Sequence, residues 1–496
     1  MKDTEDELEL LIRSKHGLIL LDTAEPERAD QLLAVLASRL SLFHFSWTRS
    51  RGLRRGTQSG DPWIEKTEEP AKGLARVLEE GAGIFHFRGL GAFLEDAAIA
   101  SHLLDAVTHV GTRRGAIVIS GTDVHLPDSL RAVGVTARLP VPDFNEQRQL
   151  LERLIREHSA RGPLRVEITQ EERLRLVNNL VGLTQLEAER VVTRLIIEDG
   201  ALRAEDIARA ATAKRQVVEQ GGLLEYHAPE SGLGEVAGLD GLKSWLSRRR
   251  AVVTDPQRAQ EFGLGFPRGV LLLGVPGCGK SMAAKAIASE WGLPLLKLDP
   301  ANLYDKYIGD SEKNFKRAMQ TAERLAPIVL WIDELEKAFA SSGGEEDGGV
   351  SRRVFGTFLS WLQERKGDVF VTATSNDIAK LPPEFIRKGR FDEIFFVDLP
   401  TPAVREEVLR IHLRKRKQDA TRIDVAQLAA ASEGFSGAEL EQVVVAALYA
   451  AFASKAPLDT AMLLREVKGT KPLSGTMRER IAELRAWAAD RTVPAA

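Results

Sequence analysis

Cysteine is nearly absent from this sequence, because its 496 residues include a single one, Cys278. One cysteine excludes an intrachain disulfide framework and a cysteine-rich metal site. The nine histidines do not form a His-Glu-x-x-His motif, so a fused zinc protease is excluded as well. This composition is typical of a reducing compartment, and we expect the protein to be cytoplasmic.

The sequence also lacks an excess of charge of either sign. Its 68 Lys and Arg residues nearly balance 71 Asp and Glu residues, which leaves a formal net charge of −3. No basic field therefore indicates nucleic acid, and the basic clusters at 49–55 and 410–417 lack the interleaved aromatic residues of a nucleic-acid surface. We interpret these clusters as solvated helix faces or interface charges, and we expect no nucleic-acid partner.

Long apolar runs are missing too. No run approaches the roughly 18 residues that a membrane-spanning helix needs, and the acidic first residues, 1–7, lack the basic-then-apolar plan of a signal peptide. We therefore expect no membrane association. The 44% hydrophobic and 28% charged residues are typical of a folded globular protein, and a chain of 496 residues predicts about two to four domains.

An eight-residue segment carries the strongest chemical signal in the chain. Residues 274–281 read Gly-Val-Pro-Gly-Cys-Gly-Lys-Ser, the G-x-x-x-x-G-K-S pattern of a phosphate-binding loop, between an expected strand at 269–273 and an expected helix from Met282. Glycines let backbone N–H groups surround the phosphates. Lys280 brings its charge to the β- and γ-phosphates, and Ser281 offers a hydroxyl to Mg²⁺. The alternative is a glycine-rich turn that matches the pattern by chance.

Two apolar segments after this loop end in polar residues. The expected strand at 328–332 runs into Asp333 and Glu334, which predicts that Asp333 holds Mg²⁺, directly or through water, and that Glu334 activates the attacking water as a general base. The expected strand at 369–375 delivers Asn376, whose amide can orient that water. The alternatives are a solvated acidic turn and an asparagine in an ordinary turn.

The segment 381–392, Leu-Pro-Pro-Glu-Phe-Ile-Arg-Lys-Gly-Arg-Phe-Asp, makes the chain resemble the AAA family of ring-forming ATPases over roughly 238–448. The resemblance implies that ATP is hydrolysed to ADP and phosphate between the subunits of a homo-oligomer, usually a hexameric ring. It also implies that Arg387 and Arg390 reach the γ-phosphate of the neighbouring subunit. A guanidinium suits that role because it neutralises charge on phosphoryl oxygens. The alternative is surface salt bridging by these two arginines.

The same resemblance extends the expected nucleotide site. Val236-Ala-Gly-Leu-Asp240 is similar to the segment whose backbone meets the adenine, with Ala237 in place of its first glycine. His412 resembles the histidine beside adenine and ribose, and the Gly-Ala pair at 437–438 resembles the second sensor region. The expected cofactor-binding residues for ATP are Gly238, Leu239, Pro276, Gly277, Cys278, Gly279, Lys280, Ser281, Met282, His412, Gly437 and Ala438.

Tyr307-Ile308-Gly309 is similar to the aromatic–hydrophobic–glycine pore loop of the family. An aromatic side chain on a loop that lines a central channel can hold an extended polypeptide through nonspecific packing. The resemblance therefore implies that Tyr307 and Ile308 contact a protein substrate. The alternative is a core tyrosine in a strand-to-helix turn.

The chain contains an internal repeat with an offset of 252 residues. Gly17–Leu21 resembles Gly269–Leu273, and Gly182–Val192 resembles Gly434–Val444 at the same offset. A period of a whole domain predicts a tandem duplication and not a solenoid. In the first copy, Asp22–Ala29 has no glycine cradle and no lysine at the matching place. We interpret this copy as a nucleotide-dead AAA-like domain kept for structure or partner binding; the alternative is chance similarity between two α/β domains.

These observations predict an α/β fold in which a P-loop NTPase sheet is sandwiched by helices, followed by a helical lid and preceded by the degenerate AAA-like domain. The expected bounds are 1–212 for the degenerate domain, 213–229 for a linker, 230–400 for the ATPase large subdomain, and 401–496 for the lid with a C-terminal helix. Short segments at 221–226, 331–339 and 472–477 further resemble uncharacterised AAA-domain proteins of cyanobacterial and plastid genomes.

Three functions are compatible with these motifs. The favoured hypothesis is a motor that uses ATP to thread or remodel a protein substrate. The second is a nucleotide-gated scaffold or regulator whose N-terminal domain binds a partner. The third and weakest is a DNA-associated AAA factor. The sequence does not identify the substrate or the pathway.

Overall fold

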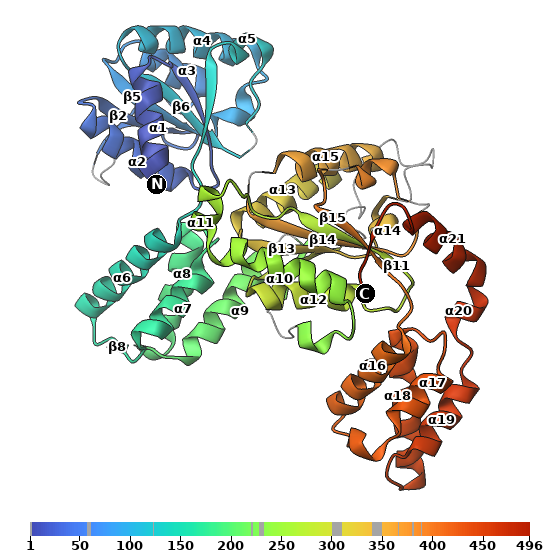
Figure 1. The fold of residues 1–496 in the computed structure, drawn as a ribbon. Coiled ribbons are helices and arrows are strands. Elements are labelled where there is room, and N and C mark those ends of the chain that lie inside the picture. Colours follow the sequence, from blue (N-terminus) through green and yellow to red (C-terminus); the bar gives the residue numbers. More distant parts are fainter. Residues whose placement is uncertain are drawn as a thin grey trace. The chain divides into compact units, whose positions relative to one another are not determined.

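A computed structural model of the full chain forms two compact units, Met1–Lys214 and Arg215–Ala496. The structure describes residues 2–56, 61–122, 124–219, 222–227, 233–299, 310–339, 350–365, 367–378, 381–387 and 389–496. The expected pore-loop residues, Tyr307 and Ile308, lie outside these described residues. Each unit contains a seven-stranded sheet, which confirms the expected α/β class (Figure 1).

The first unit is built on a mixed sheet in the order β4-β3-β2-β5-β6-β1-β7. Its strands are β1 (Leu18–Asp22), β2 (Phe43–Thr48), β3 (Gly52–Arg55), β4 (Trp63–Ile64), β5 (Gly83–Arg88), β6 (Ala116–Gly121) and β7 (Gly134–Arg138). The pairs β2–β3 and β3–β4 are antiparallel, and the other neighbours are parallel. Helices α1 (Lys2–Arg13), α2 (Pro26–Arg39), α3 (Pro70–Val77), α4 (Ala97–Thr112) and α5 (Asp128–Arg131) cover it.

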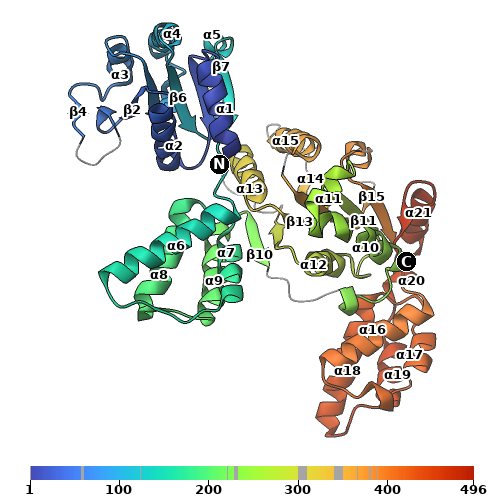
Figure 2. The same cartoon turned by 60° about the vertical axis from the view of Figure 1, so that its left-hand side comes forward.

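The first sheet is buried on both faces, and the alternation of side chains along β1 explains how. Leu18 and Leu20 join the cluster that contains residues of α3 and α4, whereas Ile19 and Leu21 join the cluster that contains residues of α1 and α2. Successive side chains of a strand point to opposite faces, so a continuous apolar run serves both layers. The sheet therefore lies between two helical layers (Figure 2).

A helical segment completes the first unit. It consists of α6 (Phe144–Arg161), α7 (Gln170–Leu180), α8 (Gln185–Asp199) and the larger part of α9 (Glu205–Glu219), whose last residues belong to the second unit, with a short parallel pair of β8 (Arg165–Val166) and β9 (Ala201–Leu202). Capping boxes begin three of these helices, at Asp143, Thr169 and Thr184. Each pairs an N-cap side chain with a glutamate three residues later, which satisfies free N–H groups and fixes where the helix starts.

The second unit contains a sheet in the order β10-β12-β13-β14-β11-β15-β16. Its strands are β10 (Leu224–His227), β11 (Gly269–Gly274), β12 (Leu295–Leu298), β13 (Ile328–Ile332), β14 (Val369–Ser375), β15 (Glu393–Val397) and β16 (Val493–Pro494). All neighbours are parallel except β10 and β12. The strands expected at 269–273, 328–332 and 369–375 are confirmed.

Helices cover both faces of the second sheet. Residues of α13 (Asp310–Arg324) and α15 (Val350–Glu364) belong to the cluster on one face, and residues of α10 (Asp240–Thr254) and α12 (Lys280–Trp291) belong to the cluster on the other. Two shorter helices, α11 (Pro256–Glu261) and α14 (Leu335–Phe339), complete this part.

The segment 213–229, expected to be a linker, contains regular structure. Helix α9 continues to Glu219, and Leu224–His227 form the edge strand β10, which pairs with β12 in an antiparallel manner. Leu223 and Leu224 are buried in the core of the second unit. Burial of these leucines explains why the segment after the glycines joins the sheet.

After β15 the chain forms a helical lid with a core of its own. The lid consists of α16 (Pro402–Lys415), α17 (Val425–Ala431), α18 (Gly437–Ser454) and α19 (Thr460–Gly469), packed through residues such as Leu409, Leu428 and Val444. The chain then returns to the sheet through α20 (Leu473–Thr476), α21 (Arg478–Ala488) and β16. The expected C-terminal helix is present, but the strand that follows it was not expected.

The two units share one strand connectivity, which supports the duplication. The central order β2-β5-β6-β1-β7 of the first sheet matches β12-β13-β14-β11-β15 of the second when strands are ranked along the chain. The register agrees as well: Leu18 pairs with Ile117, and Val270, which lies 252 residues after Leu18, pairs with Thr372. By this register His86 corresponds to Ile332. Phe87 and Arg88 therefore occupy the positions that correspond to Asp333 and Glu334 of the second unit.

Side chains fill the place of the phosphate loop in the first unit. At the offset of 252, Glu25 corresponds to Gly277 and Arg28 to Lys280. Arg28 is buried, with Nη1 3.1 Å from Glu25 Oε2 and Nη2 2.8 Å from Glu146 Oε1. Glu25 Oε1 accepts the backbone N–H of Gln185, the first residue of α8. The expectation of a lost lysine holds, and the structure adds that an arginine neutralised by two carboxylates takes its place.

We expect Arg28→Met to destabilise the first unit by about 3 kcal/mol, because it leaves a buried carboxylate cluster without its counter-charge. Burial already raises the pKa of Glu25 above its ordinary value. Hydrogen exchange of α2 and α8 peptides at increasing denaturant measures the change. The matched control is Arg39→Met on the same helix, where Arg39 is half-exposed and pairs with Glu5 and Glu9, so a loss below about 1 kcal/mol is expected. Equal losses in the two variants contradict the argument.

Candidate active site

The loop between β11 and α12 has a backbone that its glycines make possible. A Cβ on Gly274 would lie 2.0 Å from the carbonyl oxygen of Val397 on β15, so the two strands approach too closely for any side chain. Gly277 and Gly279 have φ of +75° and +90°, which L residues rarely adopt. The curved loop directs the start of α12 toward the cavity, where a helix N-terminus favours an anion.

Lys280 follows this loop as the first residue of α12 and is 5% exposed. Its Nζ donates hydrogen bonds to the carbonyl oxygens of Gly274 at 3.0 Å and Val275 at 2.8 Å. Burial lowers the pKa of Lys280 to about 8. An anionic ligand beside this amine would favour its charged form, so the loop is electrostatically suited to bind phosphate.

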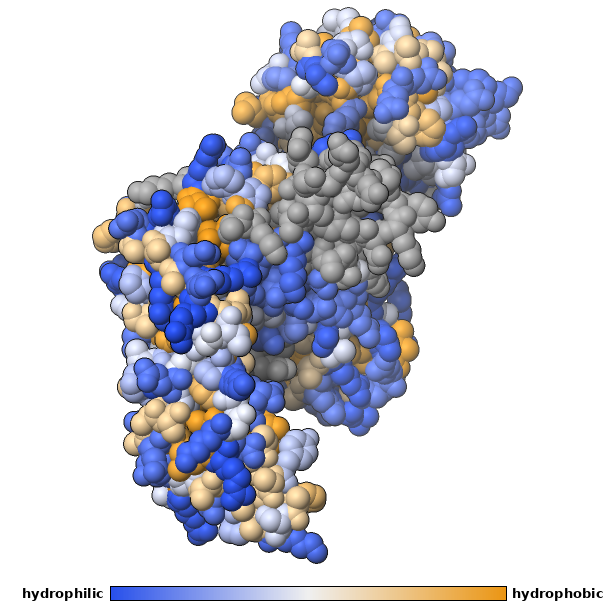
Figure 3. Space-filling model, turned by 90° about the vertical axis from the view of Figure 1, so that its right-hand side faces the viewer, coloured by the Kyte–Doolittle hydropathy of each residue, from blue (hydrophilic) through white to orange (hydrophobic). Residues whose placement is uncertain are grey.

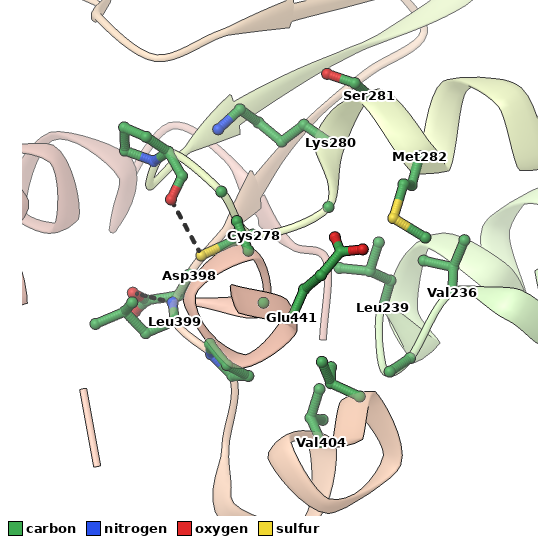
Figure 4. Close-up of a pocket in the computed structure, with 18 of the residues that line it drawn as sticks. Val236, Leu239, Cys278, Lys280, Ser281, Met282, Asp398, Leu399, Val404 and Glu441 are labelled. Atoms are coloured by element: carbon green, nitrogen blue, oxygen red, sulfur yellow. Dashed lines mark hydrogen bonds between the residues drawn. The ribbon is translucent and has the colours of Figure 1, made fainter. Parts of the chain in front are cut away.

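The loop opens into a cavity of about 440 Å³ that the large subdomain and the lid share. Figure 4 shows Lys280 and Ser281 on one side, Val236 and Leu239 on another, and Val404 of α16 below. The lining has an apolar part, composed of Val236, Leu239, Val404, Val408 and Ile411, and a polar part, composed of Lys280, Ser281, Asp333, Glu334 and Asn376. A volume of this size is typical of small-molecule sites, and the division fits a base at one end and phosphates at the other.

The two expected Mg²⁺ ligands meet in this cavity. Ser281 Oγ donates to Asp333 Oδ1 at 3.0 Å, and Thr374 Oγ1 donates to the same oxygen at 2.5 Å. A hydroxyl and a carboxylate are oxygen ligands of the kind that Mg²⁺ prefers beside phosphates. The donor set therefore fits that ion. Among the residues that the structure describes, no cluster of three or more His, Cys, Asp or Glu side chains could hold a metal ion.

The two expected water-handling residues also line the cavity. Glu334 has an unusual φ of +50°, and its backbone N–H donates to Thr374 Oγ1 at 3.0 Å. Its Oε2 lies 2.6 Å from Lys337 Nζ. The backbone N–H of Asn376 donates to Glu336 Oε1 at 2.9 Å. Side chains of the site thus hold the backbones of both residues.

His412, expected beside adenine and ribose, lines the cavity from the lid. It is buried, and its Nδ1 is 3.5 Å from Glu441 Oε1. Burial lowers the pKa of His412 below its ordinary value. The imidazole is therefore favoured in its neutral form, which suits a contact with an uncharged base or sugar.

Among the expected site residues that the structure describes, three do not line the cavity of a single chain. The N–H of Gly238 donates to Glu407 Oε2 of α16 at 3.0 Å, so this glycine connects the turn before α10 to the lid. Arg387 is exposed, and Arg390 donates to the carbonyl oxygen of Glu384. The other expected cofactor-binding, metal and water-handling residues line the cavity: Leu239, Pro276, Gly277, Cys278, Gly279, Lys280, Ser281, Met282, Asp333, Glu334, Asn376, His412, Gly437 and Ala438.

The chain matches known protein families in both of its units. The model of the ATPase family associated with various cellular activities (AAA) matches residues 270–399, and that of the AAA+ lid domain matches 422–461. The N-terminal and second domains of SpoVK-like AAA ATPases match residues 4–139 and 145–221. The AAA domain-containing protein ycf46 of Guillardia theta is 33% identical over 484 residues, which are 97% of this chain and 94% of that protein. The chain belongs to the AAA ATPase family.

Other AAA relatives match the chain over a smaller part. The cell division cycle protein 48 homolog of Archaeoglobus fulgidus is 30% identical over 373 residues, which are 70% of this chain and 50% of that protein. The ATP-dependent zinc metalloprotease FtsH of Ralstonia pickettii is 34% identical over 244 residues, which are 48% of this chain and 34% of that protein. The resemblance inferred from the motifs is confirmed.

Several residues of this AAA site were not expected from the sequence. Thr374 bridges Asp333 and Glu334, Glu336 holds the Asn376 backbone, and Asp398 and Glu441 line the cavity. A signal for Thr374 exists, because Thr372 and Thr374 are polar residues at alternate positions of an apolar strand. Ala496, which also lines the cavity, has no sequence signal, since it lies far along the chain from every motif.

The surface of the AAA chain carries apolar residues in several places. On the side drawn in Figure 3, hydrophobic residues are scattered in small groups among hydrophilic ones. Scattered apolar residues of this kind are normal on folded domains. Among the described residues, no helix is both long and apolar enough to cross a membrane.

We expect Ser281→Ala to remove most of the Mg²⁺ dependence of nucleotide binding, because the variant loses one of two adjoining oxygen ligands. In the unsubstituted protein, Mg²⁺ should tighten ATP binding by about tenfold over EDTA, and in the variant by less than about twofold. Titration of a fluorescent ATP analogue measures both affinities. Ser289→Ala is the control, because Ser289 lies on the same helix but does not line the cavity. An unchanged Mg²⁺ effect in Ser281→Ala contradicts the assignment.

Proposed function

We propose that this protein is a hydrolase that converts ATP and water to ADP and phosphate. The observation that carries this proposal is the convergence of Ser281, Asp333, Glu334 and Asn376 at the end of one cavity whose opposite end is apolar. A bound nucleotide would place its base against Val236 and Leu239 and its phosphates against the Lys280 loop. Binding alone would not require a general base or a water-orienting amide at the phosphate end.

In this proposal each polar side chain has one role. Lys280 binds the phosphates, and Ser281 with Asp333 holds Mg²⁺, which would neutralise phosphate charge when bound. Glu334 accepts a proton from the attacking water, and Asn376 orients that water. Glu334 pairs with Lys337 in this structure, so its carboxylate must leave that partner to act as a base.

We further propose that the site is completed by a second copy of the chain. Arg387 and Arg390 do not line the cavity of their own chain, and Arg387 is exposed. Arginines that approach the γ-phosphate from a neighbouring subunit would neutralise charge that develops during phosphoryl transfer. A homo-oligomeric ring, a hexamer by family resemblance, provides that arrangement. A cytoplasmic location stays a prediction from the composition.

The favoured biological role is ATP-driven threading or remodelling of a protein substrate. Support comes from the Tyr307-Ile308-Gly309 motif, and from relatives that include an ATP-dependent metalloprotease and a cell division cycle protein 48 homolog. The chain has no His-Glu-x-x-His motif, so it lacks the zinc-protease signature that the name of the metalloprotease relative implies.

A regulator or scaffold is the second candidate, and the first unit favours it. Glu25, Arg28 and Glu146 fill the place that a phosphate loop would occupy, so a role of this unit would not depend on nucleotide bound there. In that case ATP would set the state of the assembly, and the first unit would carry the partner site. The motor would need ATP hydrolysis for its biological effect, whereas the regulator would need only ATP binding.

We expect Glu334→Gln to bind one ATP per chain and to hydrolyse it at least about 100-fold more slowly, because the amide cannot accept the proton. Calorimetric titration gives the stoichiometry, and phosphate release gives the rate. Glu290→Gln is the control, since Glu290 on α12 pairs with Arg250 on α10 and does not line the cavity. Two ATP molecules per chain contradict the filled first unit, and an unchanged rate contradicts the assignment of the base. If the non-hydrolysing variant still supports the biological output, the regulator is favoured.

The motor hypothesis makes a separate prediction about Tyr307. The substrate is first identified as a protein that the Glu334→Gln variant traps. Tyr307→Ala should slow the processing of this substrate by more than about tenfold and leave basal ATPase activity within about twofold. The reason is that the aromatic ring would contact the polypeptide and not the nucleotide. Fluorescence of a labelled substrate measures processing. Tyr449→Ala on the exposed face of α18 is the matched control. Unimpaired processing in Tyr307→Ala rules out threading through this loop.

A further inference from the structure

The C-terminal strap, residues 477–496, runs from the lid back to the second sheet and contains α21 and β16. Ile481 and Leu484 of α21 are buried, and Trp487 packs against the core of the large subdomain. Figure 1 shows α21 beside the sheet, away from the four lid helices. The strap is therefore attached to the ATPase sheet and is not a lid element.

The first polar attachment of the strap is at the end of β14. Arg480 Nη2 lies 2.5 Å from Asp377 Oδ2, and Asp377 is the residue that follows Asn376. The N–H of Asn376 is held from the other side by Glu336 Oε1 at 2.9 Å. The turn that carries the water-orienting amide is thus held between α14 and the strap.

The second attachment is at the turn between β15 and the lid. Arg485 binds Asp398 in a bidentate manner, with Nε 2.8 Å from Oδ2 and Nη2 2.9 Å from Oδ1. Asp398 lines the cavity, and its Oδ1 also accepts the N–H of Leu399. Thr401, two residues after Leu399, caps the first lid helix, so this pair fixes the turn at which the lid begins.

The third attachment is the backbone of the last residues. The N–H of Ala495 donates to the carbonyl oxygen of Phe396 at 3.0 Å, and the carbonyl oxygen of Ala495 accepts the N–H of Leu242 at 3.1 Å. Leu242 lies in the first turn of α10, which starts at Asp240 directly after the N-cap residue Leu239. Ala496 lines the cavity. The strap therefore contacts the segments that form three walls of the nucleotide site.

We expect the two ion pairs to contribute little to the attachment of the strap. The side chains of Arg480 and Arg485 are 46% and 50% exposed, those of Asp377 and Asp398 are 13% and 39% exposed, and solvent weakens partly exposed ion pairs. The buried residues of α21 and the strand β16 supply the attachment instead. Each ion pair instead fixes the position of its aspartate side chain, because a charged hydrogen bond is directional.

We propose that Arg480 and Arg485 are positioning residues of the ATP site: Arg480 sets the Asn376 turn through Asp377, and Arg485 sets the lid hinge through Asp398. This inference rests on the proposed ATPase function. The two arginines act on different steps, because Asn376 orients the attacking water, whereas the hinge determines how the lid closes on the bound nucleotide.

The test uses the full chain with the variants Arg480→Met, Arg485→Met and Arg491→Met. For Arg480→Met we expect kcat to fall about fivefold with KM within about twofold. For Arg485→Met we expect KM for ATP and the Kd for a fluorescent ADP analogue to rise about fivefold, with kcat within about twofold. Arg491, exposed on the same strap and stacked on Trp487, should leave all constants unchanged.

Two further variants separate positioning from loss of packing. Arg485→Lys, which keeps the charge, should recover part of the ADP affinity, and the exchange Arg480→Asp with Asp377→Arg should recover part of kcat. Equal changes of kcat and KM in both methionine variants, or values that match Arg491→Met, overturn the proposal.

The outcome for the strap can be told apart from the outcome for the ATPase assignment. If the unsubstituted protein binds ADP but hydrolyses no ATP, the ATPase assignment fails on its own. Loss of ADP affinity in Arg485→Met, together with faster hydrogen exchange at 376–378 in Arg480→Met, then still supports the strap. If the ADP affinity of Arg485→Met and the hydrogen exchange of Arg480→Met both equal the wild-type values, the proposed role of the strap is overturned.

Discussion

The carboxyl ends of parallel strands meet at one edge of a sheet, and the candidate active site depends on this constraint. In the second sheet, β14 lies between β13 and β11. The acidic pair after β13, Asn376 after β14 and the phosphate loop after β11 are therefore neighbours although many residues separate them in the chain. Open parallel sheets bind ligands at this edge. The hydrogen bonds of Thr374 to Asp333 and Glu334 connect two of these strand ends directly.

The same constraint acts in the first unit, where the chemistry at the edge differs. The connectivity of the central strands is retained, but Phe87 and Arg88 replace the acidic pair, and Glu25 and Arg28 replace Gly277 and Lys280. In the second unit the N–H of Ala438 on α18 donates to the carbonyl oxygen of Gly277. In the first unit the matching helix α8 donates to the carboxylate of Glu25. In the first unit the Glu25 carboxylate thus accepts a hydrogen bond at the position where the second unit has space for a bound anion.

The edge of the second sheet also explains how the C-terminal strap reaches the site. Strand β15 is adjacent to β11, so a strand added beside β15 lies two strands from the phosphate loop. β16 is that strand, and backbone pairing with β15 places Ala496 at the cavity. Because pairing uses main-chain groups, it needs no side-chain motif. The large subdomain is therefore completed by a segment that follows the lid in the chain.

The sequence by itself determined the α/β class, the family, the strands beside each motif and most of the cavity lining, because glycine, lysine and acidic residues at fixed spacing have few other uses. It also determined the repeat, through two segments at one offset. Only the tertiary structure decided that Arg28 is neutralised by Glu25 and Glu146, that Thr374 and Glu336 hold the backbones of Glu334 and Asn376, that Gly238 turns toward Glu407, and that β16 joins the sheet. These features arise from contacts between residues far apart in sequence, where local pattern and spacing carry no information.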